Sequence, residues 1–186
     1  MRAVELLSVC LFSVLVLINA AILAVSVWLL PLAALIGWLL ADLLSGLAHW
    51  AGDRFGSERT PVLGPALIRP FREHHTDPRA MTRHDFIEVN GASCLGCLPI
   101  PAVLIFFPFN SFIHSVMVFF CFGILLANQC HKWAHTQTPP ALVRTLQRLR
   151  LILRADEHRL HHRPPHNSHF CTASGWLNRP LNSILK

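Results

Sequence analysis

The stretch that decides the fold is LAALIGWLLADLLSGLAHWAGD, residues 32–53. Between residues 32 and 50 its only charged residue is Asp42, and a run of this length suits a helix that crosses a lipid bilayer. His49 and Asp53 stand one helical turn apart at its end, so their side chains share one face of that helix. The stretch therefore predicts a membrane span that ends in two potential metal ligands.

An apolar run also precedes this stretch, at residues 6–30, and contains no charged residue. As a helix it could reach about 37 Å, which exceeds the thickness of the hydrocarbon layer. A secretory signal peptide is the rival interpretation. The long apolar core and Glu5 both disfavour a signal peptide, so we expect a retained span that ends at the punctuating Pro31.

Two further apolar runs occupy residues 92–109 and 112–127, with a turn signal at 108–111 between them. They form either a tight hairpin of two spans or one re-entrant pair, and both alternatives return the chain to the side it left. We therefore expect an all-α integral membrane protein with about four transmembrane helices, at 6–30, 32–50, 92–109 and 112–127, in a single domain over residues 1–186.

The positive charges support this arrangement independently. All 16 Lys and Arg residues fall in segments 1–5, 52–91 and 128–186, which four spans place on one side of the membrane. The positive-inside rule makes that side cytoplasmic. The formal charge of +6 could suggest a nucleic-acid partner, but the long uncharged runs place the basic residues beside a membrane instead. We expect no nucleic-acid binding.

Eleven of the 12 histidines fall on the predicted cytoplasmic side, where segments 52–91 and 128–186 would form a histidine-rich cap. Several are spaced for one face of a helix: His131 and His135 are four residues apart, and His158 precedes His161 and His162 by three and four. Imidazole suits zinc, copper and iron equally, so spacing alone does not identify the metal. A mononuclear catalytic site needs about three protein ligands, so eight or nine candidates favour two metals.

The other histidines are interpreted differently. His114 lies in an apolar run near the opposite face, and we expect a structural role for it. His166 and His169 stand in a Pro- and Asn-containing loop and are left out of the predicted ligand set. A titrating or merely basic surface is the competing interpretation of the cap, but such a surface does not need repeated helical spacing.

Residues 142–160 carry a leucine stripe at helical spacing, with arginines off the stripe. Pro139 and Pro140 suit the start of such a helix. The pattern predicts one amphipathic helix, lying in the membrane interface or packed on the rest of the protein.

Read in order, the polar segments resemble a known family. The residues that carry the resemblance are His49-Trp50-x-x-Asp53, Phe71-Arg72-Glu73-His74-His75-x-Asp77-Pro78, Thr82-x-His84-Asp85-Phe86-x-Glu88-x-Asn90-Gly91, Asn128-Gln129-x-His131-Lys132-Trp133-Ala134-His135, His158-x-x-His161-His162-x-Pro164-Pro165-His166 and Gly175-Trp176-Leu177-Asn178-x-Pro180-Leu181. Together they are similar to the lipid desaturase family that contains plasmanylethanolamine desaturase, over roughly residues 40–182. The segment Thr172-Ala173-Ser174 departs from the Thr-rich stretch usual in the family, which bears on substrate choice more than on metal binding.

The resemblance implies a membrane di-iron enzyme that uses O2 and two electrons from an external donor such as cytochrome b5 or ferredoxin. It implies a membrane phospholipid substrate, with a 1-O-alkyl ether (plasmanylethanolamine) converted to the vinyl ether of a plasmalogen. Carried over by position, the metal ligands are His49, His74, His75, His84, His131, His135, His158, His161 and His162. Because metal-bound histidines commonly donate their other N–H to a neighbouring group, we expect that outer role for Asp53, Asp85, Asn128 and Asp156.

Three alternatives remain open at this point. An acyl-lipid desaturase or a hydroxylase could use the same scaffold. A zinc-dependent membrane hydrolase would need a different metal, although no His-Glu-x-x-His sequence is present. A metal transporter should carry ionisable residues deep in its spans, where only Asp42 and His114 qualify.

Overall fold

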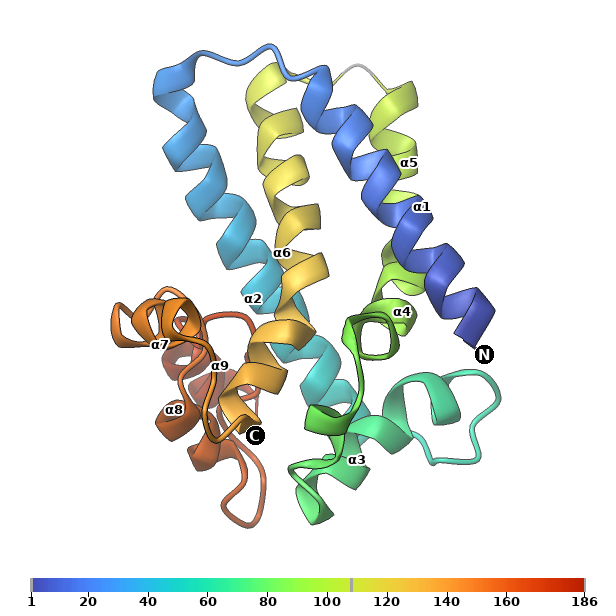
Figure 1. Cartoon of the computed structure of the whole chain (residues 1–186), viewed down its shortest axis with the longest axis vertical. Helices are drawn as coiled ribbons and strands as arrows, with labels where there is room; N and C mark the ends of the chain where they lie inside the picture. Colours follow the sequence, from blue (N-terminus) through green and yellow to red (C-terminus); the bar gives the residue numbers. More distant parts are fainter. Residues whose placement is uncertain (1, 108, 186) are drawn as a thin grey trace. The chain divides into compact units, whose positions relative to one another are not determined.

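The computed structural model describes residues 2–107 and 109–185, and the described residues form helices and no strands (Figure 1). In chain order the elements are α1 (Arg2–Ala21), η1 (Val27–Leu29), α2 (Leu30–Arg54), η2 (Gly64–Ile68), α3 (Arg69–Thr76), η3 (Ala80–Arg83), α4 (Phe86–Cys97), α5 (Pro99–Phe106), α6 (Ser111–His135), α7 (Ala141–Arg148), α8 (Ala155–His161) and α9 (Asn178–Ile184). They divide into unit 1, residues 2–41 and 86–126, and unit 2, residues 42–85 and 127–185. The all-α prediction is confirmed.

In unit 1, α1 packs against α4 and α5 (Figure 1). Its buried side chains recur at helical spacing, and Phe12 and Val16 are almost fully covered. Asn19 is also buried, and its amide donates hydrogen bonds to the carbonyls of Leu15, at 2.8 Å, and Pro101, at 2.9 Å. A polar group can be buried in this way because its donor has partners.

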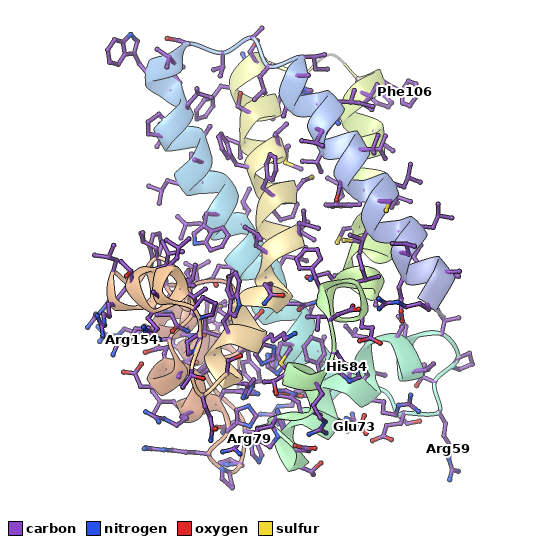
Figure 2. All side chains as sticks on the ribbon, viewed as in Figure 1. Arg59, Glu73, Arg79, His84, Phe106 and Arg154 are labelled. Atoms are coloured by element: carbon purple, nitrogen blue, oxygen red, sulfur yellow. The ribbon has the colours of Figure 1, made fainter. Side chains whose placement is uncertain are left out.

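The outward faces of unit 1 are apolar. Leu7, Trp28 and Phe106 are 66%, 87% and 80% exposed, and Figure 2 shows the Phe106 ring pointing away from its helix. Large exposed apolar patches mark surfaces that bind another protein or a membrane. Together with the lengths of the helices, this favours contact with lipid.

Three helices are long and apolar enough to cross a membrane: Arg2–Ala21, Val27–Arg54 and Ser111–His135. The pair α4 and α5 makes a fourth if it counts as one span, and the pair is bent by 47° at its break. Proline cannot donate a backbone hydrogen bond, and Pro99 and Pro101 follow directly on the break. The expectation of about four spans thus compares with three candidate helices, or four spans if the bent pair counts as one.

The first predicted span, at residues 6–30, is wrong at its C-terminal end because α1 stops at Ala21. Pro31, which was predicted to end this span, does not end a helix. It lies in the first turn of α2, where its missing N–H is not needed. The turn predicted at 108–111 includes Pro108, which is outside the described residues, while Ser111 begins α6.

Helix α6 is longer than predicted. It continues past residue 127 to His135, so the segment that carries His131 and His135 is helical. The predicted one-turn spacing of these two side chains is therefore realised.

In unit 2 the C-terminal region packs on the last part of α2. Phe170, Cys171, Leu181 and Leu185 form a buried cluster, against which Leu43, Trp50 and Leu177 pack. This cluster brings α2 into contact with residues more than 100 positions later in the chain. Its Phe170 ring packs beside His49.

The amphipathic helix predicted over 142–160 is broken into α7 and α8. After α7 ends at Arg148, Arg150 adopts a left-handed φ of 59°. The N–H of Leu153 then donates to the carbonyl of Ala173, at 2.8 Å, instead of continuing a helix. A hydrogen bond to a distant segment has overridden the local helical pattern.

Candidate metal centre

Eight imidazoles meet inside unit 2, and they come from four helices. They are His49 on α2, His74 and His75 on α3, His131 and His135 on α6, and His158, His161 and His162 on α8 and its C-cap. Their ligand atoms form two groups, within each of which all atoms lie within 4.8 Å of one another. We call them the α6–α8 cluster (His74, His131, His135, His158, His162) and the α2–α3 cluster (His49, His74, His75, His161).

In the α6–α8 cluster the Nε2 atoms converge on one point. His158 Nε2 lies 2.8 Å from that of His131, 2.9 Å from that of His135 and 3.1 Å from that of His162. The two α6 histidines are 3.3 Å apart at the same atoms. Adjacent nitrogen ligands of one ion, each bound at about 2.1 Å, are separated by roughly 3 Å. The spacing therefore fits four nitrogens around a single metal ion.

The protonation of these rings supports the same conclusion. A neutral imidazole has one N–H donor and one acceptor nitrogen, so four converging Nε2 atoms cannot all find a donor among themselves. Both ring nitrogens of His74, which faces the same point, are buried without a hydrogen-bond partner. Buried polar atoms normally have partners, and a cation would supply the missing one to the converging lone pairs.

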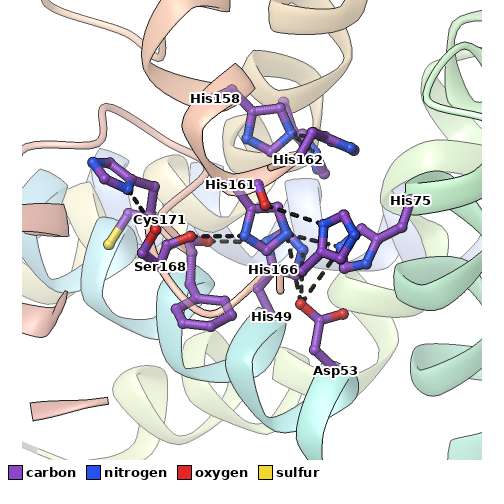
Figure 3. A network of polar contacts seen from close by, with 12 residues as sticks. His49, Asp53, His75, His158, His161, His162, His166, Ser168 and Cys171 are labelled. Carbon is purple, nitrogen blue, oxygen red and sulfur yellow. Dashed lines mark hydrogen bonds and ion pairs between the residues drawn. The ribbon is translucent and has the colours of Figure 1, made fainter. Parts of the chain in front are cut away.

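The α2–α3 cluster lies against a carboxylate, that of Asp53 (Figure 3). Asp53 Oδ2 lies 3.6 Å from the Nε2 atoms of His49, His75 and His161. The Asp53 side chain is only 6% exposed, and neither carboxylate oxygen accepts a hydrogen bond. A buried carboxylate without hydrogen-bond donors is costly, so a bound cation fits this site too.

Two backbone carbonyls fix the orientation of ligands in this cluster. Nδ1–H of His49 donates to the Phe170 carbonyl at 3.0 Å, and Nδ1–H of His161 donates to the Ser168 carbonyl at 2.8 Å. A carbonyl can only accept, so both rings carry their proton on Nδ1. Nε2 is then left with its lone pair facing the cluster, which is the arrangement metal-bound histidines use.

Burial keeps these imidazoles neutral. Burial, and after it the neighbouring histidines, lower the pKa of His74 to about 2 and that of His161 to about 3, although the hydrogen bond to Ser168 opposes the shift at His161. The pKa values of His75 and His162 fall to about 4 for the same reasons. At pH 7 the rings hold no extra proton, and their lone pairs are available to a metal.

The cluster histidines are eight of the nine that the sequence predicts as ligands. The ninth, His84, is exposed and belongs to neither cluster, and its backbone carbonyl accepts a hydrogen bond from Lys132.

The predicted outer partners lie in different surroundings. Asp53 lies beside the α2–α3 cluster, with Oδ2 facing the Nε2 atoms of His49, His75 and His161. Asp156 forms a salt bridge with Arg154. Asp85 is exposed and Asn128 is half-buried.

One neighbour of the centre escaped the sequence-based prediction. The His166 ring stacks on His75, with centroids 4.4 Å apart and planes 17° from parallel, and its Nδ1–H donates to the His161 carbonyl at 3.2 Å. Its spacing of four residues from His162 was a usable signal, but its surrounding loop residues suggested otherwise.

His114 is buried in unit 1 and belongs to neither cluster. It lines a cavity of about 290 Å³ together with mostly apolar residues such as Leu104 and Phe107. Its expected structural role stays a prediction.

Comparison with known proteins adds independent information. The lipid desaturase domain model matches residues 38–185. The chain is 49% identical to "Plasmanylethanolamine desaturase" of Myxococcus xanthus, over 84% of this chain and 57% of that protein. It is 45% identical to "Plasmanylethanolamine desaturase 1" of Mus musculus, over 84% of this chain and 61% of that protein. It is also 39% identical to "Fatty acid desaturase 4, chloroplastic" of Arabidopsis thaliana, over 81% of this chain and 47% of that protein.

The chain thus spans about half to three fifths of the length of these relatives. No solved structure matches it significantly. The domain match covers most of the chain and includes every histidine of both clusters. The chain belongs to the lipid desaturase family.

Proposed function

We propose that this chain is an O2-dependent di-iron lipid desaturase that converts a 1-O-alkyl ether phospholipid, plasmanylethanolamine, to the vinyl ether of a plasmalogen. The observation that carries the proposal is the convergence of eight neutral imidazoles, five of them buried and three half-buried, into two clusters that share His74. The names of the bacterial and mouse relatives supply the substrate class.

The chemistry requires a redox metal. Forming the double bond removes two hydrogen atoms from adjacent carbons, and with two further electrons and two protons O2 becomes two molecules of water. Bound iron would supply the activation of O2 and the removal of hydrogen. An external carrier such as cytochrome b5 or ferredoxin would supply the two additional electrons.

The protein contributes ligands and their orientation. In this proposal the α6–α8 cluster holds one iron ion and the α2–α3 cluster holds the other. Asp53 is a direct ligand rather than an outer partner, because its Oδ2 faces three imidazole nitrogens and accepts no hydrogen bond. The carbonyls of Phe170 and Ser168 keep His49 and His161 in the tautomer that leaves Nε2 free.

The membrane setting follows from the helices. Three helices, or four spans with the bent pair, are apolar enough to cross a bilayer, so the lipid substrate can enter from the membrane. The distribution of Lys and Arg favours a multi-pass protein with its metal centre on the cytoplasmic side.

A second candidate is an acyl-lipid desaturase on the same scaffold, because the plant relative is named a fatty acid desaturase. Hydroxylation would use the same centre. A zinc-dependent hydrolase is disfavoured by ligand number, because catalytic zinc commonly uses three protein ligands and an open position.

One experiment separates these candidates. The chain is expressed in cells that lack plasmalogens and are fed an alkyl ether lipid, and acid-labile vinyl ethers are measured by mass spectrometry. We expect vinyl ethers with the wild-type chain and none with His158→Ala. A new double bond in an acyl chain would favour the second candidate, and an iron-loaded chain that changes neither lipid would contradict both.

A further inference from the structure

Asp42 is a buried carboxylate within an apolar stretch, and no part of the proposed chemistry uses it. Its side chain is fully buried, and its oxygens accept three backbone hydrogen bonds. Oδ1 accepts from Ser174, at 2.7 Å, and Gly175, at 3.1 Å, while Oδ2 accepts from Leu177, at 3.3 Å. Three hydrogen bonds to one side chain tie residues 174–177 to α2.

The residues it holds continue a longer segment, residues 168–177, which we call the docking segment. The segment follows one face of α2. Asp42, Ser45 and His49 lie within about 60° of one another around that helix, because they are separated by three and seven residues. Ser45 Oγ accepts the N–H of Thr172 at 3.0 Å, and His49 Nδ1–H donates to the Phe170 carbonyl.

The docking segment approaches α2 closely. A Cβ atom at Gly46 would lie 2.7 Å from Cys171 Sγ and 3.4 Å from the Cys171 backbone nitrogen. Only glycine leaves room for this contact without a shift of the segment. Asp42, Gly46 and His49 thus lie in consecutive turns of α2 and face the same stretch of backbone. Asp42 accepts hydrogen bonds from it, Gly46 leaves room for it, and His49 donates to it.

The same segment also contacts the other helix that carries ligands. Its Ser168 carbonyl accepts from His161 on α8, and its Ala173 carbonyl accepts the N–H of Leu153, two residues before α8 begins. Figure 3 shows the contact between His161 and Ser168, with His49 and Cys171 nearby. One segment thus sets the orientation of an imidazole from each helix.

We infer that Asp42 is a positioning residue of the metal centre. By holding residues 174–177 it fixes the docking segment, and the segment's Phe170 and Ser168 carbonyls keep Nε2 of His49 and His161 directed into the α2–α3 cluster. The inference rests on the proposed function only in that both imidazoles bind metal. Asp42 touches neither metal nor lipid, so its effect passes through the backbone.

The test uses Asp42→Asn in the purified full chain, with cobalt(II) as the metal probe. The amide keeps the size of the carboxylate, but it loses the charge and replaces one accepting oxygen with a donor. Asn19→Ala is the matched control, because Asn19 is an equally buried polar residue whose hydrogen bonds lie in unit 1. The visible ligand-field spectrum, the cobalt affinity and the melting temperature are measured for each.

We expect both variants to melt at lower temperature than the wild type. Asp42→Asn should also weaken cobalt binding by about tenfold, the lower end of the effect of losing an outer partner, and change the ligand-field bands. Asn19→Ala should keep the wild-type bands and affinity. Wild-type bands and affinity in Asp42→Asn would overturn the inference, whatever its melting temperature.

A second variant covers failure of Asp42→Asn to fold. Ser45→Ala removes only the acceptor of Thr172, so it should shift the same bands by less, and unchanged bands would overturn the inference. A wild-type chain that binds neither cobalt nor iron would overturn both this inference and the proposed function. A chain that binds iron but makes no vinyl ether would contradict the proposed substrate alone.

Discussion

His74 differs from the other cluster histidines because its ring belongs to both clusters. It is 4% exposed, and neither of its ring nitrogens has a hydrogen-bond partner. One nitrogen of an imidazole binds one ion at a time. The His74 ring can therefore bind an ion in one cluster while it packs against the ligands of the other. Its removal should therefore affect both sites.

We predict that His74→Ala lowers iron to well below one ion per chain, whereas His135→Ala leaves about one of two. His135 lies in the α6–α8 cluster alone, so its loss spares the α2–α3 cluster. Iron is measured by mass spectrometry of metals after anaerobic purification. Equal iron content in the two variants would show that His74 has no shared role.

A second prediction separates ligand from scaffold. His161→Ala should abolish turnover, exceeding the roughly 10–100-fold loss typical of outer partners, because a ligand and its lone pair disappear. His114→Ala should keep most activity, since His114 lies in unit 1. Product formation is measured at matched expression. A well-expressed but inactive His114→Ala chain would contradict the site described here.

Residue-level prediction from sequence succeeded where local spacing decides position. His131 with His135, and His158 with His162, share a helix face whatever the rest of the chain does. It could not predict that Asp53 faces three imidazoles at once, because that depends on where α3 and α8 pack. Nothing in the sequence next to His84 shows that it lies outside both clusters.

At the scale of elements, α1 and α4 approach closely at Gly91. A Cβ atom there would lie 2.6 Å from Glu5 Cβ and 2.9 Å from Glu5 Cα, so the α1 backbone must move to admit it. Close helix contacts in membranes depend on such small residues.

We predict that Gly91→Leu destabilises the protein by about 1–3 kcal/mol, the usual cost of overpacking. Iron content should stay near that of the wild type in the folded fraction, because every cluster histidine lies in unit 2. Thermal unfolding in detergent measures the loss of stability. Metal analysis of the folded fraction measures the iron content. Gly96→Leu is the control, since a Cβ at Gly96 meets no atom within 4 Å.

Helices were predictable from composition, whereas their ends were less so. The apolar runs predict α1, α2 and α6, but the end of α1 at Ala21 lies inside an uninterrupted apolar stretch. The break between α7 and α8 depends on the hydrogen bond from Leu153 to Ala173, twenty residues away. Local periodicity contains no information about such a partner.

For the whole molecule, the distribution of positive charge predicts topology. We expect Ser57 and Ser183 on the same, cytoplasmic side of the membrane. Both are exposed, so cysteines placed there can react with an impermeant reagent. The parent chain is the control because Cys10 is also exposed. Labelling of the two positions from opposite sides would refute the shared histidine cap.

Acid should destabilise the iron-stripped protein. Burial lowers the pKa of His75 and of His162 to about 4 in the folded chain, whereas an unfolded histidine titrates near 6.5. Between these values the unfolded chain binds more protons, so stability is fully present above pH 6.5 and is lost as pH falls toward 4. Melting temperatures at pH 7.5 and pH 5 check this. A chain with both histidines replaced by Gln should show a smaller difference.

The distance along the chain between the ligands has a consequence for biosynthesis. His49 leaves the ribosome 113 residues before His162, an interval of roughly 6–23 s at ordinary elongation rates. During that time α2 is available to insert in the membrane while α8 and the docking segment do not yet exist. Iron delivered to the nascent chain would meet only the earliest ligands. In the proposed function, complete metallation would therefore follow the emergence of α8 and the docking segment, and a pause before that point would prolong the period in which an incomplete set of histidines can capture the wrong metal.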